Sequence, residues 1–414
     1  MRSCILASAS SSGIPTTDGG TAYHFPTPGG FTGWSTSENA RQMHVSSPCK
    51  LKNLRIDHDV SPGVGNSYDY IVRVNGTDTA LAVNINPGAL SATDSTHEVY
   101  VNDGDIIGLK VVAHGTPTPP TTQRLKYSIE LEAPKSIPIF SGHGTASGNT
   151  VDIFLNPLYV GTSNVEANQN PAVGIIPVAG TLRMFRARAT VQPGASTWTY
   201  TLMKGTSFGT LANTALTCQI TGSGGAGFTA IDRLHTVKVN AGDMVAVRIS
   251  PGSSPAAAAH KFAFEFIPDN DADTFWAYGT SAVPATGILR MEEACGVGGS
   301  NWTNVDVTRS GPVPAGYTVK SIYAAVGTAP GAGTKWTFTL RRNAAATTDT
   351  VDIADTNQQN NLTGQNIALT AGDLMNLSCQ NTTGTPAAMT DGAKVGVGLT
   401  GPTTTKKKPL LCLT

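Results

Sequence analysis

Residues 239–249, VNAGDMVAVRI, alternate apolar and polar side chains on both sides of a central Gly-Asp. The same outline occurs twice more, as VNDGDIIGLKV at 101–111 and as LTAGDLMNLSC at 369–379. Alternation with period two is typical of a β-strand that is buried on one face, and the Gly-Asp interrupts it between two such strands. Three copies of one strand–turn–strand signal predict a fold that is repeated three times along the chain.

Three further signals recur in the same order around each Gly-Asp. An apolar strand (KLKNLRI, TLRMFRA, TVKSIYA) precedes a Pro-Gly turn, an alternating aromatic strand follows (YDYIVRVN, WTYTLMKG, WTFTLRRN), and an apolar strand closes the unit (LKYSIEL, KFAFEF, KVGVGL). Proline presets φ and glycine accepts positive φ, so Pro-Gly marks a tight turn. Short strands between turns, with almost no helical periodicity, predict an all-β chain of three tandem antiparallel β-sandwich units of the jelly-roll type.

The repeats also set the expected domain boundaries. We expect an N-terminal arm over 1–20, units over 21–133, 137–268 and 274–401, and a C-terminal tail over 402–414. The linkers EAPKSIP and IPDNDADTF reach only ~25 Å even when fully extended, so neighbouring units must lie close together. A pseudo-threefold arrangement and a row of units both satisfy this constraint.

The composition favours a neutral, hydrogen-bonding surface. Charged residues make up 14% of the chain, and 28 Lys and Arg balance 28 Asp and Glu. Soluble proteins average about 25% charged residues. The absence of a net positive charge argues against a nucleic-acid partner, and no segment approaches the ~20 apolar residues of a membrane span. The six cysteines stand singly, which is typical of buried thiols.

The Gly-Asp residues themselves are the first candidate site. A carboxylate can serve as an acid or a metal ligand, but none of the three motifs contains a His or a Glu. We therefore interpret them as structural turns, in which replacement of Gly242 by Val destabilises the second unit without removing any chemistry. The residues concerned are Gly104, Asp105, Gly242, Asp243, Gly372 and Asp373.

An acidic stretch between the second and third units is the best candidate for a metal site. Asp269, Asp271 and Asp273 alternate as at the start of a calcium loop. Thr274 stands where that loop needs Gly, and Thr280 where it needs Glu. A solvated acidic linker is the favoured interpretation and calcium the alternative; we expect no other cofactor.

The sequence offers little support for catalysis. It contains no G-x-S-x-G and no H-E-x-x-H, so neither a hydrolase elbow nor a zinc protease is indicated. A carboxylate pair for glycoside cleavage stays open, because such residues meet only in space. We expect a protein that is not an enzyme.

Two further sets of residues suit binding. Trp34, Trp276 and Trp302 lie in the irregular opening segments of the units and could stack on sugar rings, or simply cover a core edge. The tail combines basic residues that could steer a partner with leucines that could dock on it. The alternative for the tail is a disordered terminus; its candidate residues are Lys406, Lys407, Lys408, Leu410 and Leu411.

The motifs WTYTL, V-x-A-G-D-x-V and F-x-F together resemble the β-sandwich domains of tailed-bacteriophage virion proteins, such as head decoration proteins, fibres and baseplate attachments. V-x-A-G-D-x-V is also similar to the tumour-necrosis-factor-like jelly roll that caps collagen-like surface proteins, although this chain has no Gly-x-y tract. The resemblance implies assembly or carbohydrate binding rather than catalysis.

The leading hypothesis is therefore a structural virion protein, a capsid decoration or a tail or fibre component. It would bind other virion proteins and copies of itself through apolar and neutral polar surfaces. It would be found in the virion, outside the cell after assembly in the host cytoplasm. The alternative is a lectin-like surface protein that binds a carbohydrate or a cell-surface receptor, and a glycan-degrading enzyme is the least favoured hypothesis.

Overall fold

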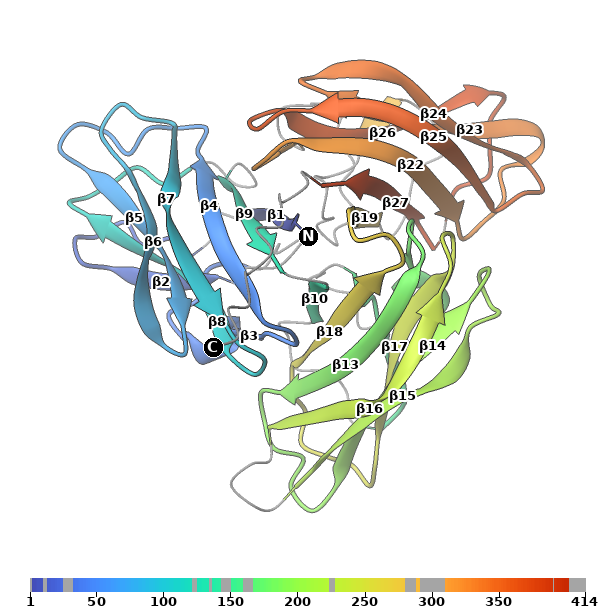
Figure 1. Cartoon of the computed structure of the whole chain (residues 1–414), viewed down its shortest axis with the longest axis horizontal. Helices are drawn as coiled ribbons and strands as arrows, with labels where there is room; N and C mark the ends of the chain where they lie inside the picture. Colours follow the sequence, from blue (N-terminus) through green and yellow to red (C-terminus); the bar gives the residue numbers. More distant parts are fainter. Residues whose placement is uncertain are drawn as a thin grey trace, which may run out of the picture.

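The computed structural model describes residues 2–9, 13–24, 33–120, 125–133, 136–142, 150–158, 167–222, 228–279, 288–290, 310–389 and 391–401. Their regular structure is β-strand apart from two short 3-10 helices, η1 and η2. The strands form three groups that follow the chain, here called units 1, 2 and 3 (Figure 1).

Unit 1 contains β1 (Arg2–Ala9), β2 (Thr21–His24), η1 (Asn39–Arg41), β3 (Met43–His44), β4 (Cys49–Asp57), β5 (Ser67–Val74), β6 (Thr77–Ile85), β7 (Ser91–Val101), β8 (Ile106–His114) and β9 (Leu125–Glu132). Unit 2 contains β10 (Ile137–Gly142), β11 (Ile153–Leu155), η2 (Asn170–Ala172), β12 (Gly174–Ile175), β13 (Gly180–Ala189), β14 (Thr197–Gly205), β15 (Ala212–Thr221), β16 (Thr229–Val239), β17 (Met244–Pro251) and β18 (His260–Pro268). Unit 3 contains β19 (Asp273–Gly279), β20 (Ile288–Arg290), β21 (Gly311–Pro312), β22 (Tyr317–Val326), β23 (Gly331–Arg342), β24 (Ala345–Asp355), β25 (Gln359–Leu369), β26 (Leu374–Thr383) and β27 (Ala393–Thr400).

Each unit consists of two antiparallel sheets with one strand order. In unit 1 the first sheet runs β1-β9-β4-β7 and the second β2-β8-β5-β6, and the sheets of the other units repeat this order with their own strands. A two-residue strand, β3, β12 or β21, also pairs into the second sheet, which is therefore five-stranded. Two sheets connected in this order form a jelly roll. The predicted all-β, antiparallel sandwich fold is thus confirmed.

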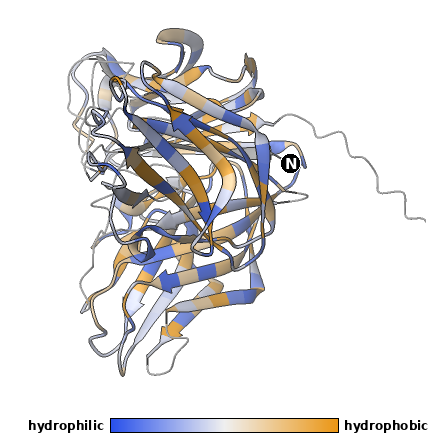
Figure 2. Ribbon diagram, turned by 90° about the vertical axis from the view of Figure 1, so that its left-hand side faces the viewer, coloured by the Kyte–Doolittle hydropathy of each residue, from blue (hydrophilic) through white to orange (hydrophobic). Residues whose placement is uncertain are grey.

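The two sheets of each unit face each other across a hydrophobic cluster. Apolar and polar residues alternate along the strands (Figure 2), as period-two patterning requires. The aromatic strands β5, β14 and β23 turn their predicted faces inward, and these side chains are fully buried: Tyr68, Tyr70, Val72, Trp198, Tyr200, Leu202, Trp336, Phe338 and Leu340.

The segment expected as an N-terminal arm includes the first strand of unit 1. β1 pairs with β9 over eight positions, from Arg2 opposite Glu132 to Ala9 opposite Leu125. β10 on β18 and β19 on β27 are the equivalent pairs in the other units. Strand pairing across more than a hundred residues leaves no local pattern, so the sequence alone does not reveal that residues 2–9 join this sheet.

The units form a closed ring rather than a row. Figure 1 shows them around a common centre, with β1, β10 and β19 toward the inside. The two-residue strand of each unit contacts the last strand of the next unit. These contacts are β3 with β18, β12 with β27 and β21 with β9. The last of these contacts joins unit 3 back to unit 1, so the arrangement is pseudo-threefold.

Each Gly-Asp forms a tight turn between two long strands. Gly104, Gly242 and Gly372 have φ of 93°, 92° and 92°. The amide of the following Asp donates to the carbonyl three residues before it at 3.1 Å in every copy. The carboxylate accepts from the amide of that same residue, at 2.7 Å in unit 1 and 2.8 Å in units 2 and 3.

We predict that Gly242→Ala and Gly372→Ala each lower the free energy of unfolding by about 1–3 kcal/mol, because φ near 92° strains any residue with a Cβ. Gly242→Ala should be the more damaging, since its Cβ would lie 3.2 Å from the Tyr323 ring, whereas at Gly372 the nearest atom is the flexible Arg55 guanidinium at 3.8 Å. Urea denaturation measures both. Gly316→Ala is the matched control, and an equal effect at all three positions would contradict the turn's role.

Candidate functional site

The Gly-Asp turns also make the contacts between units. Gly104 lies against Arg186 of unit 2, Gly242 against Tyr323 of unit 3, and Gly372 against Arg55 of unit 1. Each of β4, β13 and β22 has a register shift against its partner strand, and Arg55, Arg186 and Tyr323 occupy the same position shortly after it. One position on each unit therefore receives the turn of its neighbour, and the side chain there decides the chemistry of that interface.

A lysine at one position of each last strand reaches into the neighbouring unit. Lys126, Lys261 and Lys394 are all less than 8% exposed. The Lys261 ammonium donates to the carbonyls of Ala40 at 2.8 Å and Gln42 at 3.0 Å, at the end of η1. The Lys394 ammonium donates to Pro171 O in η2 at 2.7 Å, and that of Lys126 to Ser310 Oγ at 3.3 Å. Buried ammonium groups require such partners, so these bonds fix how the units dock.

Ion pairs join units 1 and 2 at the Gly104 turn. Asp103, directly before Gly104, accepts from Arg186 and Arg233 at 2.8 Å each. Further cations lie behind this pair: burial, followed by the charge of Arg188, lowers the pKa of His44 to about 4. Burial also lowers the pKa of Lys261 well below its usual range. Asp103 is thus an acidic partner at the edge of a strongly cationic contact.

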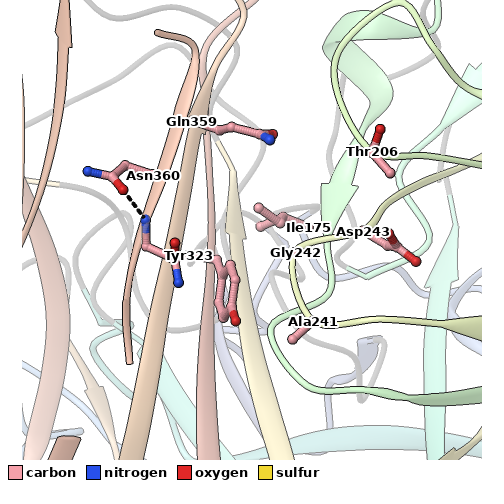
Figure 3. Close-up of a pocket in the computed structure, with 9 residues that line it drawn as sticks. Ile175, Thr206, Ala241, Gly242, Asp243, Tyr323, Gln359 and Asn360 are labelled. Carbon is pink, nitrogen blue, oxygen red and sulfur yellow. Dashed lines mark hydrogen bonds between the residues drawn. The ribbon is translucent and has the colours of Figure 1, made fainter. Parts of the chain in front are cut away.

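At the Gly242 turn, the interface between units 2 and 3 is hollow, and the Asp243 carboxylate there pairs with Lys204 of its own unit. A cavity of about 300 Å³ is lined by the Gly242 turn, by Tyr323 of β22 and by the start of β25. Figure 3 shows Thr206 and the Gly242 turn on one side, facing Tyr323 and Gln359 on the other. We call this cavity the 2–3 pocket; it is lined by Ile175, Thr206, residues 241–243, Tyr323 and residues 359–361.

An apolar cluster supports the unit 2 side of this interface. Ile175, Met244 and Ala246 of unit 2 pack in one cluster with Ala325, and Tyr323 lies against it. Apolar contact therefore holds the two units together beneath the pocket, while the pocket itself stays open.

The predicted metal-site residues do not converge. Asp269 pairs with Lys238, and Asp273 accepts from Asn270 Nδ2 and Thr400 Oγ1 at 3.3 Å. Within the part of the chain that the structure describes, no group of three His, Cys, Asp or Glu side chains is placed to hold a metal. The geometry of this stretch is that of a hydrogen-bonded linker turn.

Two of the predicted stacking residues are inside the protein. Trp34 is 5% exposed, with its ring centroid 5.1 Å from His24 and 5.8 Å from Tyr70. Trp276 is 1% exposed and packs on Tyr317 at 5.9 Å. Both rings cover a core, so neither presents a face to a sugar. Trp302 and the tail residues Lys406, Lys407, Lys408, Leu410 and Leu411 lie outside the described residues.

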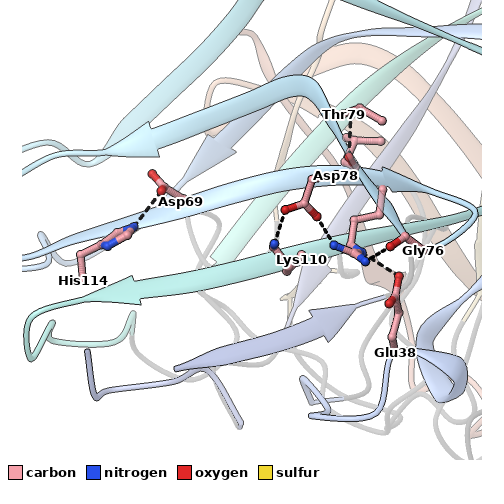
Figure 4. Close-up of polar contacts among 9 residues, drawn as sticks. Glu38, Asp69, Gly76, Asp78, Thr79, Lys110 and His114 are labelled. Carbon is pink, nitrogen blue, oxygen red and sulfur yellow. Dashed lines mark hydrogen bonds and ion pairs between the residues drawn. The ribbon is translucent and has the colours of Figure 1, made fainter. Parts of the chain in front are cut away.

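A group of charges on the second sheet of unit 1 is internally paired. Arg73 bonds Glu38 at 2.7 Å and also Asp78, which in turn pairs with Lys110 (Figure 4). His114 contacts Asp69 at 2.7 Å farther along the same sheet. These groups satisfy one another and offer no unpaired acid or base.

Sequence reasoning missed two repeated features. The interface lysines begin the last strand of each unit, and aligning the three copies would have found them. The second feature is D-x-x-H in β7 and β16, where Asp94 contacts His97 and Asp232 contacts His235, both at 2.9 Å. The described cysteines Cys49, Cys218 and Cys379 are buried and free, as expected of packing thiols.

Neither a scan against protein-family models nor a search of curated proteins found a match for this chain. Among the described residues, the structure has no helix of the length and apolarity needed to cross a bilayer.

We predict that Asp103→Asn lowers the free energy of unfolding by about 2 kcal/mol at low salt, because Arg186 then lacks its acidic partner beside other cations. The deficit should shrink as salt screens the remaining repulsion. Urea denaturation at two ionic strengths measures it. The control is Arg233→Gln, which removes only the half-exposed partner; an equal loss in both variants would contradict the assignment.

We predict that Asp94 stabilises the fold only above acidic pH. Burial opposes its ionisation, but the amides of His97 and Thr96 outweigh this and lower its pKa from 3.8 to about 2. A depressed carboxyl pKa contributes stability that is present above about pH 4 and lost as pH falls toward 2, here about 2 kcal/mol. Asp94→Asn should therefore show its deficit at neutral pH and lose it near pH 2, as followed by denaturation across pH. A deficit that does not depend on pH would refute this assignment.

Proposed function

We propose that this chain is a non-enzymatic structural and attachment protein of a virion, a capsid decoration or a tail or fibre component. The observation that carries the proposal is the closed ring of three jelly rolls within one chain. The jelly roll is a common fold of viral capsid and lectin domains. The motif resemblance to virion proteins of tailed bacteriophages points to the same class.

The way the ring is held supports an attachment role. Joining the units covalently replaces assembly of separate subunits by an intramolecular step, so the ring does not depend on protein concentration. The interfaces use buried lysines, an arginine–aspartate contact and apolar packing, all within the chain. The outward surfaces remain available for a lattice, for other virion proteins or for a host cell.

The surface chemistry is consistent with this role. With only 14% charged residues and no net charge, long-range repulsion between neighbouring copies is weak. Thr, Ser and Asn supply hydrogen bonds that lattice contacts can use without burying charge. Close packing on a particle surface is therefore favourable.

We predict that the protein copurifies with virus particles. An antibody against the purified protein should detect it in nuclease-resistant particles banded on a density gradient from the source culture, in a constant ratio to the other structural proteins. Immunogold labelling would then place it on the head or the tail. Its absence from such particles, with all of the protein in the cell envelope or the soluble fraction, would overturn the proposal.

A further inference from the structure

The 2–3 pocket is a departure from the symmetry of the ring. At the position where Asp103 stands in unit 1, unit 2 has Ala241, and where Arg186 receives the turn in unit 2, unit 3 has Tyr323. The ion pair that closes the 1–2 interface is thus absent from the 2–3 interface. A space of about 300 Å³ is found there instead.

The rim of the pocket departs from the repeat as well. In β22 and β25, Tyr323 lies opposite Asn361, and the preceding residues are Gln359 and Asn360. The register of the other units places Thr229-Ala230-Ile231 and Ser91-Ala92-Thr93 at these positions. Three exposed carboxamides therefore replace small or apolar residues at the 2–3 interface, where the pair of Asp103 with Arg186 has no equivalent.

The carboxamides and a hydroxyl supply donors and acceptors without charge. Asn360 is held by two bonds, from its Nδ2 to Asp352 O at 2.7 Å and from the Asn361 amide to its Oδ1 at 2.9 Å. The side chains of Gln359 and Thr206, by contrast, make no hydrogen bond within the described part of the chain. The Asn360 side chain is therefore held in place before a ligand binds, whereas Gln359 and Thr206 have donors and acceptors to offer to a ligand.

The ionised group at the pocket is already neutralised. The Asp243 carboxylate accepts from the Asn240 amide at 2.8 Å and pairs with the Lys204 ammonium at 2.9 Å. A charged ligand would find no unpaired partner among these groups. The Tyr323 ring and Ile175 add an apolar wall on which a C–H face can lie.

We propose that the 2–3 pocket binds one neutral sugar residue. The sugar hydroxyls match the amide and hydroxyl groups of the rim, and the Tyr323 ring takes the apolar face of the pyranose. The volume is at the lower end of the ~300–1,000 Å³ of small-molecule sites, which suits a single ring rather than a chain of sugars. This inference is independent of the virion role, because a sugar site can exist on a protein of either class.

Ligand-observed saturation-transfer NMR tests the inference directly. The probes are the methyl glycosides of glucose, galactose, mannose and N-acetylglucosamine, with N-acetylneuraminic acid as the anionic comparison. At least one neutral glycoside should show transfer with a dissociation constant of about 1 mM or tighter. Gln359→Ala and Asn360→Ala should each weaken it about tenfold, the loss expected for one hydrogen bond.

Two further variants separate binding from folding. Thr229→Ala changes the position equivalent to Gln359 at the 1–2 interface, and it should bind as the original protein does. The double variant Ala241→Asp with Tyr323→Arg copies the Asp103–Arg186 pair into the pocket, and it should keep the melting temperature while losing transfer.

Free sugar and glycan on a surface share this chemistry, so a neutral-glycan array on the same proteins distinguishes the two sources. A site for a surface glycan gives array spots that vanish in Gln359→Ala, whereas a site for free sugar gives the NMR signal alone. No transfer from any neutral glycoside, transfer that Gln359→Ala and Asn360→Ala leave intact, or stronger binding of the anionic sugar would each overturn the inference.

Discussion

The structure depends on a close approach of bare backbone to a neighbouring unit. At each Gly-Asp turn, φ near 92° lets the chain reverse between two long strands, and the missing side chain lets the same turn lie on the next unit. A turn built from other residues would reverse the chain less easily and would hold the units apart. The local geometry of one jelly roll and the closure of the ring therefore share a single requirement for glycine.

Around this shared contact, the interfaces differ in chemistry. Arg186 forms an ion pair with Asp103, and the Tyr323 ring lies against the Gly242 turn. Arg55 lies beside Gly372 and forms an ion pair with Asp57 of its own strand at 2.8 Å. Exchanging neighbours would place unmatched charges against neutral surfaces, which is unfavourable because desolvated charges need partners. The differences thus help each unit to select its own neighbour, and they lock one order of units around the ring.

The sequence predicted what depends on local periodicity. The alternation of apolar and polar residues predicted that Tyr70, Tyr200 and Phe338 face the core. The recurrence of Gly-Asp between alternating strands predicted the repeat and the fold class. Closure of the ring could not be predicted, because contacts such as that of Lys261 with Gln42 join residues more than two hundred positions apart. The sequence left the roles of Trp34 and Trp276 open between sugar stacking and core coverage for a related reason: an irregular segment has no period, so the sequence does not show which side faces the core.

Covalent linkage allows a pocket to exist at one interface without the same residues at the other two. In a symmetric homotrimer, one set of residues must serve at every interface, so an opening that suits a ligand at one contact weakens all three. In this chain the 1–2 interface keeps its ion pair, and the apolar cluster around Met244 and Ala325 supports the 2–3 interface beneath the cavity. The absence of a charge pair at Ala241 and Tyr323 therefore leaves the Asp103–Arg186 pair of the 1–2 interface in place. In a fused ring, one interface can change its residues without changing the other two. The carboxamides at the start of β25 are such a change, and they lie at the cavity between units 2 and 3.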